Sequence, residues 1–558
     1  MYHQSVISGI ASHQQQYVAT AGYDNRVILW QADTRTPIGV GLHDHLANQV
    51  TFSPDGTLLA SSSSDYSVRL WRLPQMHLTA VLSHLDDVEG IAFHPGGKLI
   101  ATASRDRKVR LFNIDGALVR TFKGHENDVL TVRWFDSQTL VSCGDDGTLR
   151  YWSTSQNEAL KIIDLGGIET DTLCVTDQYQ IVSGNDHGEL VLLNRDGQAI
   201  TKVEAHHSGI KQLGLYKTRL ISLSYDRRFK VWDITKNKLN FISEGSMPAI
   251  IWPRSCAFLG TDRIVFVTFG DRYAEYDLAA ERWHTKQIQQ THGVNALWVE
   301  KNDIFTVGDA GIVKKNGQVT SRIPSLCNFI TRIEQEYLCG GQDGVVYHAM
   351  SSKPLYQHHS PLNCCVSIQN HEQVDCAIGT YTGEVIFLKV NQKSRQFRFV
   401  AAKQLHDNAI KGLAYSHGRL FSVCADHSVC EFELDAEMNL PRLRNGKHQK
   451  IVNGCAPFNQ GFASVSRDLT LKIWGESEKT YNSPHLNSIK CVASDNTQWI
   501  ASGDYRGTIA LFDLNSESWS SQKVSTRGIS SIFYDSLHRC FRAADYAGEI
   551  HRISIHKP

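Results

Sequence analysis

The stretch 22-GYDNRVILW-30 recurs in near copies along the chain. The copies are 64-SDYSVRLW-71, 145-DDGTLRYW-152, 225-YDRRFKVW-232 and 467-RDLTLKIW-474. Every copy places an aspartate six residues before a tryptophan, as Asp24 stands before Trp30. A catalytic group is seldom copied five times in one chain. The repetition therefore predicts a repeated structural unit in which Asp24 has a structural role.

The position of this aspartate defines a unit that occurs fourteen times, at intervals of 33 to 44 residues. The position is filled by Asp24, Asp65, Asp106, Asp146, His187, Asp226, Gly270, Ala310, Asp343, Thr382, Asp426, Asp468, Arg506 and Ala547. Within the units, short β-branched and aromatic runs such as 17-YVATA-21 alternate with Gly, Asp and Asn turns. A period near 40 residues built from short strands is typical of a four-stranded propeller blade. The sequence therefore predicts an all-β protein.

The unit resembles the WD40 repeat. Residues 43–71, HDHLANQVTFSPDGTLLASSSSDYSVRLW, match the family pattern GH...FSPDG...LASGS.D...LW over nearly the full unit. Residues 124–152 also match this pattern strongly. The regular spacing of the fourteen units extends the resemblance to the whole chain. A propeller ring usually has four to eight blades, so fourteen units imply two seven-bladed WD40 β-propellers. We expect them to occupy residues 1–289 and 290–558.

The resemblance also implies a role for the repeated aspartate. In WD40 blades, a hydrogen-bonded chain of His, Ser or Thr, Asp and Trp joins the entering loop to the second and third strands. Five units supply this tetrad: His3, Thr20, Asp24 and Trp30; His43, Ser61, Asp65 and Trp71; His125, Ser142, Asp146 and Trp152; His206, Ser222, Asp226 and Trp232; His448, Ser464, Asp468 and Trp474. Two further units have phenylalanine in place of tryptophan: His84, Thr102, Asp106 and Phe112; His406, Ser422, Asp426 and Phe432. A Ser–His–Asp hydrolase is disfavoured, because the trio recurs without a GxSxG elbow.

Partner binding in this family uses the face where the entering loops and the turns after the second strands emerge. The residue before the repeated aspartate lies there, and it is tyrosine in five units. Tyrosine is enriched in binding hot spots, although here it could instead cap the turn. The other face positions are mainly acidic in ring one and basic in ring two, so we expect a basic partner for ring one and an acidic or phosphorylated peptide for ring two. The candidate partner-binding residues are Tyr23, Arg105, Tyr225, Tyr381, Lys411, Arg467, Lys490, Tyr505 and Tyr546.

The number of strand-like segments predicts one incomplete blade. The outer strand of a blade precedes the next unit's histidine, and thirteen such segments serve fourteen blades. Either the last blade lacks a fourth strand, or 283-WHTKQI-288 completes it and the seventh blade is short. An uncovered strand edge can pair with another chain.

Composition excludes several classes of protein. Lys plus Arg and Asp plus Glu are equal at 57 each, which argues against a non-specific polyanion binder. No signal peptide or long apolar segment is evident, and the 13 cysteines lack CxxC spacing, so we expect free thiols and a cytoplasmic location. The pairs 206-HH-207, 358-HH-359 and 364-CC-365 lack zinc-ligand spacing. We expect no metal and no cofactor.

These features favour a non-enzymatic WD40 scaffold or adaptor that binds other proteins or peptides through its propeller top faces. The alternative is an RNA- or nucleotide-binding subunit of a larger complex, and a propeller enzyme ranks third. Nucleic acid is not the favoured partner, and no membrane association is expected. The sequence leaves the oligomeric state open.

Overall fold

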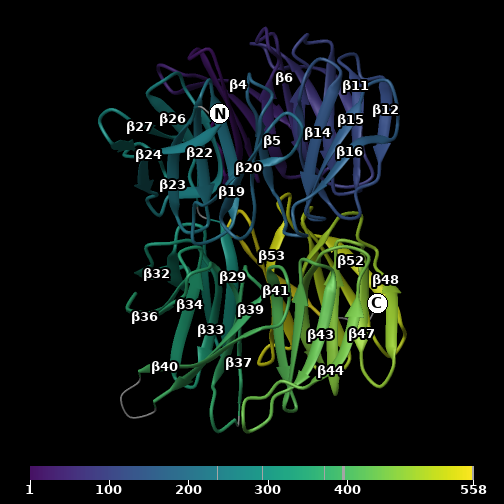
Figure 1. The fold of residues 1–558 in the computed structure, drawn as a ribbon. Helices are drawn as coiled ribbons and strands as arrows, with labels where there is room; N and C mark the ends of the chain where they lie inside the picture. The colour runs from purple at the N-terminus through teal and green to yellow at the C-terminus, as the bar shows by residue number, and fades with distance from the viewer. Residues whose placement is uncertain (236, 292, 370, 392–395, 556–558) are drawn as a thin grey trace. The chain divides into compact units, whose positions relative to one another are not determined.

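The computed structural model describes residues 1–235, 237–291, 293–369, 371–391 and 396–555. All regular structure in these residues is β-strand (Figure 1). The strands form two compact units, Met1–Thr291 and His292–Pro558. The division lies two residues beyond the boundary expected after residue 289.

The first unit holds seven antiparallel sheets of four strands each, in sequence order. Its strands are β1 (Ile7–His13), β2 (Tyr17–Gly22), β3 (Arg26–Gln31), β4 (Thr36–Leu42), β5 (Ala47–Phe52), β6 (Leu58–Ser63), β7 (Ser67–Arg72), β8 (His77–Ser83), β9 (Val88–Phe93), β10 (Leu99–Ser104), β11 (Lys108–Asn113), β12 (Leu118–Lys123), β13 (Val129–Trp134), β14 (Thr139–Gly144), β15 (Thr148–Ser153), β16 (Ala159–Asp164), β17 (Thr172–Val175), β18 (Ile181–Gly184), β19 (Glu189–Leu193), β20 (Ala199–Glu204), β21 (Ile210–Tyr216), β22 (Arg219–Ser224), β23 (Arg228–Thr235), β24 (Lys238–Ser246), β25 (Ile251–Phe258), β26 (Arg263–Thr268), β27 (Ala274–Asp277) and β28 (Arg282–His284).

The second unit holds six four-stranded sheets and one sheet of three strands, β53–β55, in its described residues. Its strands are β29 (Val294–Glu300), β30 (Asp303–Gly308), β31 (Ile312–Lys315), β32 (Gln318–Arg322), β33 (Cys327–Ile333), β34 (Glu336–Gly341), β35 (Val345–His348), β36 (Pro354–Gln357), β37 (Leu362–Ser367), β38 (Cys376–Thr380), β39 (Glu384–Val390), β40 (Phe397–Gln404), β41 (Ile410–Ser416), β42 (Arg419–Cys424), β43 (Ser428–Glu433), β44 (Arg442–Lys447), β45 (Val452–Phe458), β46 (Gly461–Ser466), β47 (Thr470–Trp474), β48 (Glu478–Asn482), β49 (Ile489–Ser494), β50 (Trp499–Asp504), β51 (Thr508–Asp513), β52 (Ser518–Lys523), β53 (Ile529–Asp535), β54 (Cys540–Asp545) and β55 (Ile550–Ser554). The protein is thus a double seven-bladed propeller.

The turn between the second and third strands of a blade has a fixed backbone shape. In thirteen units, the residue after the repeated aspartate position has a φ between 62° and 90°, in the left-handed region. These residues are Asn25, Tyr66, Arg107, Gly147, Gly188, Arg227, Gly311, Gly344, Gly383, His427, Leu469, Gly507 and Gly548. Where the preceding residue is Asp65, Asp146 or Asp226, its carboxylate accepts the backbone N–H two residues farther on and stabilises this conformation.

The apolar core lies between neighbouring blades. Second strands such as β6 are almost wholly buried, whereas outer strands such as β16 are mainly exposed. One core cluster joins Leu29 of the first blade to Val50 and Trp71 of the second. Stability therefore comes from sheet-on-sheet contact repeated around each ring.

The first ring closes through contacts between its first and seventh sheets. Strand β1 packs against β25 and β26. The His3 amide donates to the Asp271 carbonyl at 3.0 Å, and the Trp30 ring meets Tyr273 edge-on, with centroids 5.6 Å apart. No strand is exchanged between the first and last sheets in the part of this ring that the structure describes.

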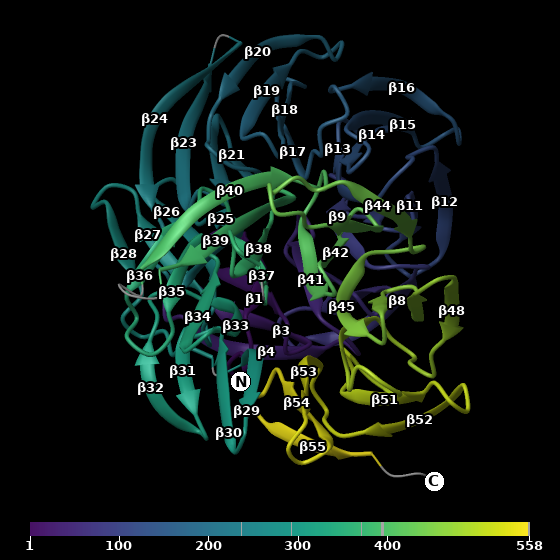
Figure 2. The same cartoon turned by 90° about the horizontal axis from the view of Figure 1, so that it is seen from below.

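The second ring closes in the same manner, and within the described residues no fourth strand pairs with β55 in its last sheet. Strand β29 packs against β53 and β54, which lie beside it in Figure 2. The Trp298 and Phe533 rings have centroids 4.9 Å apart across this contact. Of the two possibilities left by the strand count, the structure shows the first, because β28 overlaps the start of 283-WHTKQI-288 and completes the seventh sheet.

The 13 cysteines all lie in described residues, and none forms a disulfide. Burial raises the pKa of Cys174 to about 11, so this group is a thiol at neutral pH. Among the described residues, no helix has the length and apolar character that crossing a bilayer requires.

Candidate functional site

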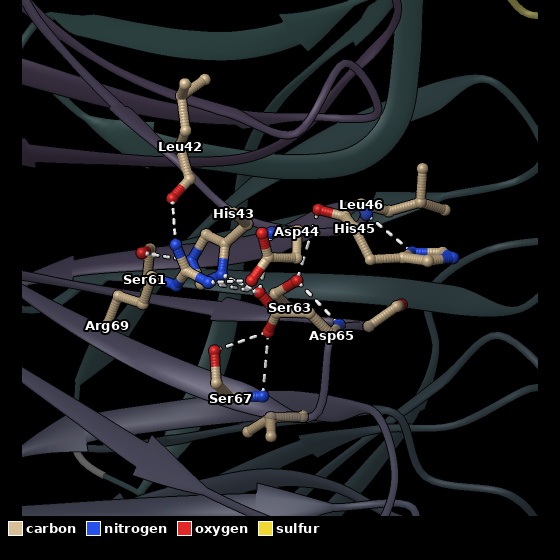
Figure 3. A network of polar contacts seen from close by, with 12 residues as sticks. Leu42, His43, Asp44, His45, Leu46, Ser61, Ser63, Asp65, Ser67 and Arg69 are labelled. Carbon is tan, nitrogen blue, oxygen red and sulfur yellow. Dashed lines mark hydrogen bonds and ion pairs between the residues drawn. The ribbon is translucent and has the colours of Figure 1, made fainter. Parts of the chain in front are cut away.

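The second blade shows what the repeated aspartate does (Figure 3). Trp71 donates its indole N–H to Ser61 Oγ at 2.8 Å, and His43 Nε2 lies 2.7 Å from the same hydroxyl. The other ring nitrogen, Nδ1, lies 2.8 Å from the Asp65 carboxylate. Asp65 also accepts the backbone N–H of Asp44 at 3.0 Å. The carboxylate thereby ties the entering loop to the second and third strands.

The four other predicted tetrads have the same geometry. The His–Asp distances are 3.0 Å for His3–Asp24, 2.7 Å for His125–Asp146, 2.9 Å for His206–Asp226 and 3.1 Å for His448–Asp468. The indole–hydroxyl distances are 2.8 Å for Trp30–Thr20, Trp152–Ser142 and Trp474–Ser464, and 3.0 Å for Trp232–Ser222. These hydroxyls are fully buried, so a substrate cannot reach them. The groups resemble a catalytic triad only in composition.

The tetrad hydrogen bonds also affect the ionisation of the aspartate side chain. Burial disfavours the charged form of Asp146, but the hydrogen bond and charge of His125 outweigh it and lower the pKa to about 2. The carboxylate is therefore ionised and fully engaged at neutral pH, rather than available as an acid or base.

The two phenylalanine-containing sets differ from the expected arrangement. In the third blade, Asp106 forms a 2.6 Å ion pair with Arg110, and His84 Nδ1 lies near a backbone carbonyl. In the eleventh blade, Ser428 lies between His406 and Asp426 and contacts both of them. The neighbouring residue on the third strand changes the path of hydrogen bonds in each case.

One further tetrad-like group had no counterpart in the sequence prediction. His485 lies 3.1 Å from Asp504 and 2.9 Å from Ser502. Asp504 stands two residues before Arg506, which fills the repeated position. Asp545 is displaced in the same way before Ala547, and it accepts the Ser525 hydroxyl at 2.6 Å. Both aspartates could have been found from the sequence. Each is the last residue of a second strand, where it follows a Ser-Gly pair (Asp504) or an Ala-Ala pair (Asp545).

The nine candidate partner-binding residues are all half-buried. In ring two, the Lys411 ammonium lies 5.2 Å from the centre of the Tyr381 ring. Tyr505 and Tyr546 are stacked, with ring centres 6.2 Å apart and an 8° angle between planes. Burial raises the pKa of Cys364 to about 12, while Lys411 and Lys490 partly offset this shift. Two of the predicted lysines therefore lie near the same thiol.

Ring-two candidate Arg467 is also half-buried, and its backbone N–H donates to the Ile451 carbonyl at 3.0 Å. That bond holds the turn carrying Arg467 against the loop that enters the same blade. The backbone of Arg467 is therefore held in place on the ring-two face.

The ring-one candidates belong to a network of charged side chains. Arg105 donates to Glu89 at 2.8 Å and to Asp128 at 2.6 Å. The Tyr225 ring lies 5.1 Å from the Lys211 ammonium. These side chains are held by internal contacts.

The last ring-one candidate, Tyr23, meets the Trp252 ring edge-on, with ring centres 5.4 Å apart. Trp252 in turn carries the Arg254 guanidinium 5.3 Å from its own ring centre. Tyr23 is therefore part of an aromatic and cationic stack that joins the first blade to the seventh.

An acidic cluster lies within this ring-one network. Ligand atoms of Asp145, Glu169 and Asp171 all lie within 4.8 Å of one another. Burial and the nearby Asp128 carboxylate raise the pKa of Asp145 well above its usual range. Lys211 lies 2.7 Å from Asp171 and partly neutralises the cluster. Clustered carboxylates with raised pKa values are typical of functional sites.

Two other groups bring three potential metal ligands together: His358, His359 and Glu384, and His406, Cys424 and Asp426. In the second group, both nitrogens of His406 are already hydrogen-bonded at 2.7 Å, to Ser428 and Ser422. The first group includes a histidine pair that was not expected to bind zinc because its two histidines are adjacent. Its third member, Glu384, is the first residue of β39.

Comparison with known proteins gives one family and several partial relatives. The family model "WD domain, G-beta repeat" matches residues 36–72, 76–113 and 116–153. The ribosome biogenesis protein YTM1 of Kluyveromyces lactis is 26% identical over 127 residues, which cover 23% of this chain and 22% of that protein. A subunit of chromatin assembly factor 1 from Mus musculus is 26% identical over 157 residues, or 26% and 24% of the two chains. The Arabidopsis thaliana transcriptional corepressor LEUNIG_HOMOLOG is 23% identical over 147 residues, or 25% and 13%. The chain thus spans about a quarter or less of these relatives.

Proposed function

We propose that this protein, which contains WD40 repeats and folds as two seven-bladed propellers, is a non-enzymatic scaffold that holds protein partners on its top faces. The proposal rests on the acidic cluster of Asp145, Glu169 and Asp171 in ring one and on the basic residues Lys411, Arg467 and Lys490 in ring two. The relatives, by their names, include an assembly-factor subunit and a corepressor, which supports a role in protein complexes. The unpaired cysteines support a reducing compartment, and we place the protein in the cytoplasm.

Ring one is proposed to take a basic partner. Asp145 and Glu169 repel each other when both are ionised, and burial raises the pKa of each. A lysine or arginine side chain from a partner would favour the ionised carboxylates and relieve this repulsion. Lys211 supplies only part of that compensation from within the ring, through Asp171 and Asp186.

Ring two is proposed to take an acidic or phosphorylated peptide. Lys411, Arg467 and Lys490 supply positive charge, and the stacked pair Tyr505 and Tyr546 supplies aromatic surface. Aromatic area combined with charge is the composition found at binding hot spots.

Two fluorescent peptides test these assignments by anisotropy on the full chain. One peptide is rich in glutamate and phosphoserine, and the other is rich in arginine and lysine. We expect Lys490→Glu and Arg467→Glu to weaken binding of the acidic peptide at least tenfold and to leave the basic peptide unaffected. Lys523→Glu, on exposed outer strand β52, is the charge-matched control. Equal effects of Lys490→Glu and Lys523→Glu would contradict a specific ring-two face.

An RNA- or nucleotide-binding role is the second candidate, because the same basic and aromatic residues could hold a polyanion. A salt titration with an oligonucleotide distinguishes the two functions. Affinity that exceeds peptide affinity and falls steeply with salt would favour RNA binding over the scaffold.

A further inference from the structure

We propose that His358, His359 and Glu384 bind a divalent transition-metal cation of the Zn²⁺ type. The two histidines lie in the loop before β37, and Glu384 is the first residue of β39 in the same blade. None of the three residues is among the proposed partner-binding residues, and the site does not depend on the scaffold function.

The three side chains meet at one carboxylate oxygen. Oε2 of Glu384 lies 3.4 Å from Nε2 of His358 and 3.5 Å from Nε2 of His359. The imidazole rings are neighbours in a tilted arrangement, with centroids 4.1 Å apart and 37° between their planes. The three potential ligand atoms all fall within 4.8 Å of one another.

These separations suit a shared cation better than direct hydrogen bonds. An N–H···O bond normally spans about 2.7–3.2 Å, which is shorter than both distances here. Ligands held about 2.0–2.1 Å from a tetrahedral zinc ion lie about 3.3 Å from one another. Two imidazoles and one carboxylate are a known zinc ligand set that leaves a position for water.

The surrounding contacts orient the ligands. The Ser360 backbone N–H donates to His358 Nδ1 at 3.1 Å, and the Ser360 carbonyl oxygen lies 3.4 Å from the same nitrogen. Metal binding through Nε2 would place the proton on Nδ1, where the Ser360 carbonyl takes the place of the amide as its hydrogen-bond partner. The Thr382 hydroxyl donates to Glu384 Oε2 at 3.2 Å. His359 is 56% exposed, so a cation reaches the site from solvent.

The chain contains a second His-His pair that provides an internal comparison. In the sixth blade, Nδ1 of His206 lies 2.9 Å from Asp226, which fills the repeated position. In the tenth blade that position is Thr382, so no tetrad aspartate competes for His358. The position of Glu384 is taken in the sixth blade by Arg228, a cation. The pair at 206–207 therefore lacks the third ligand.

Titration calorimetry of the full chain with Zn²⁺ alone tests the site. We expect His359→Ala and Glu384→Gln each to weaken Zn²⁺ binding at least tenfold. His207→Ala, in the control pair, should leave the affinity unchanged. Circular dichroism checks that each variant is folded, and His359 is exposed enough for its removal to be tolerated.

A second measurement uses Co²⁺, whose d–d absorption reports the coordination of the ion. The wild-type spectrum should show a bound ion with nitrogen ligands, and this signal should be lost in His359→Ala but kept in His207→Ala. The proposal is overturned if the wild type does not bind Zn²⁺, or if all variants bind it equally.

Discussion

The buried hydroxyl of Ser61 joins two neighbours, whereas the matching hydroxyl of Ser422 joins one. Ser61 Oγ accepts the indole N–H of Trp71 at 2.8 Å and lies 2.7 Å from His43. Ser422 keeps the histidine contact, at 2.7 Å from His406, but has no indole beside it. Each buried polar group left without a partner lowers stability by about 1–3 kcal/mol. The contribution of such a hydroxyl to the free energy of unfolding should therefore increase with the number of its hydrogen-bond partners.

Substitution of these two serines tests that relation. We expect Ser61→Ala to lower the free energy of unfolding of its ring by about 2–4 kcal/mol, because Trp71 and His43 both lose a partner. Ser422→Ala should lower it by about 1–2 kcal/mol, because only His406 is affected. Urea denaturation followed by fluorescence gives both values. Equal losses would show that the Trp71 hydrogen bond contributes nothing.

Acid should weaken the rings through the tetrad aspartates. The pKa of Asp146 is about 2 in the folded protein, below its usual value of 3.8. A carboxyl group with a lowered folded pKa stabilises the protein above the unfolded pKa and loses this effect as pH falls through the folded pKa. The free energy of unfolding should therefore decrease between about pH 4 and pH 2. In Asp146→Asn this decrease should be smaller, as urea midpoints at several pH values would show; an unchanged pH dependence would contradict the role of Asp146.

The complete tetrads could be predicted because their residues keep fixed offsets. Asp24 and Trp30 are six residues apart, and the four other sets follow the same spacing. Acidic residues that contact a histidine from another position in the unit could not be predicted in this way. Asp504 reaches His485 from two residues before the repeated position, and Glu384 reaches His359 from two residues after it. Both residues lie outside the fixed offsets, so the spacing of the units does not identify them.

The final strand of the chain's last blade is less buried than its counterparts. Ile550 is half-buried. The residue at this position in the other thirteen blades is at most 1% exposed: Val27, Val68, Val109, Leu149, Leu190, Phe229, Tyr273, Val313, Val346, Val385, Val429, Leu471 and Ile509. In those blades a fourth strand pairs with the third strand and covers its edge. In the last blade, β55 has no such neighbour among the described residues.

Two isoleucines at this position, one in each kind of blade, allow a matched test. Ile509→Ala should lower the free energy of unfolding of ring two by about 2–5 kcal/mol, because it leaves a cavity in a covered blade. Ile550→Ala should lower it by about 1–2 kcal/mol, because solvent already reaches part of the side chain. Chemical denaturation compares the variants. Losses of equal size would mean that the edge of β55 is covered in solution.

At the level of elements, the count of outer strands could be predicted, and their assignment to blades could not. Thirteen strand-like segments precede the histidines of the units, which matches the thirteen four-stranded sheets among the described residues. The segment 283-WHTKQI-288 was compatible with two blades, because its pattern fits an outer strand in either. Strand β28 (Arg282–His284) contains only the first two residues of this segment, Trp283 and His284, and its pairing with β27 assigns the segment to the seventh blade.

For the whole molecule, the fourteen units predicted two seven-bladed rings, because a single ring holds at most about eight blades. The face charges were predicted only in part. Asp145 and Lys211 lie on the ring-one face, which was expected to be mainly acidic, whereas Glu169 and Asp171 lie just before β17 in a unit whose entering loop has no histidine to align. The structure brings these four side chains together through pairing of β17 with β18 and packing of β17 against β13 and β21. Such contacts depend on ring closure, which no local pattern encodes.

Because each ring closes on its own first sheet, each unit should fold when it is expressed alone. In unit one, β1 packs on β25, and in unit two, Val294 and Leu297 share a core cluster with Ala544. We expect residues 1–291 and 292–558 each to give a β-type circular dichroism spectrum and a cooperative thermal transition. A fragment of residues 1–246 is the control, since it lacks the seventh sheet and would expose the apolar cluster that includes Phe229 and Ile221. This fragment should aggregate or unfold without cooperativity. If residues 1–291 behave like residues 1–246, closure within the unit is not sufficient for folding.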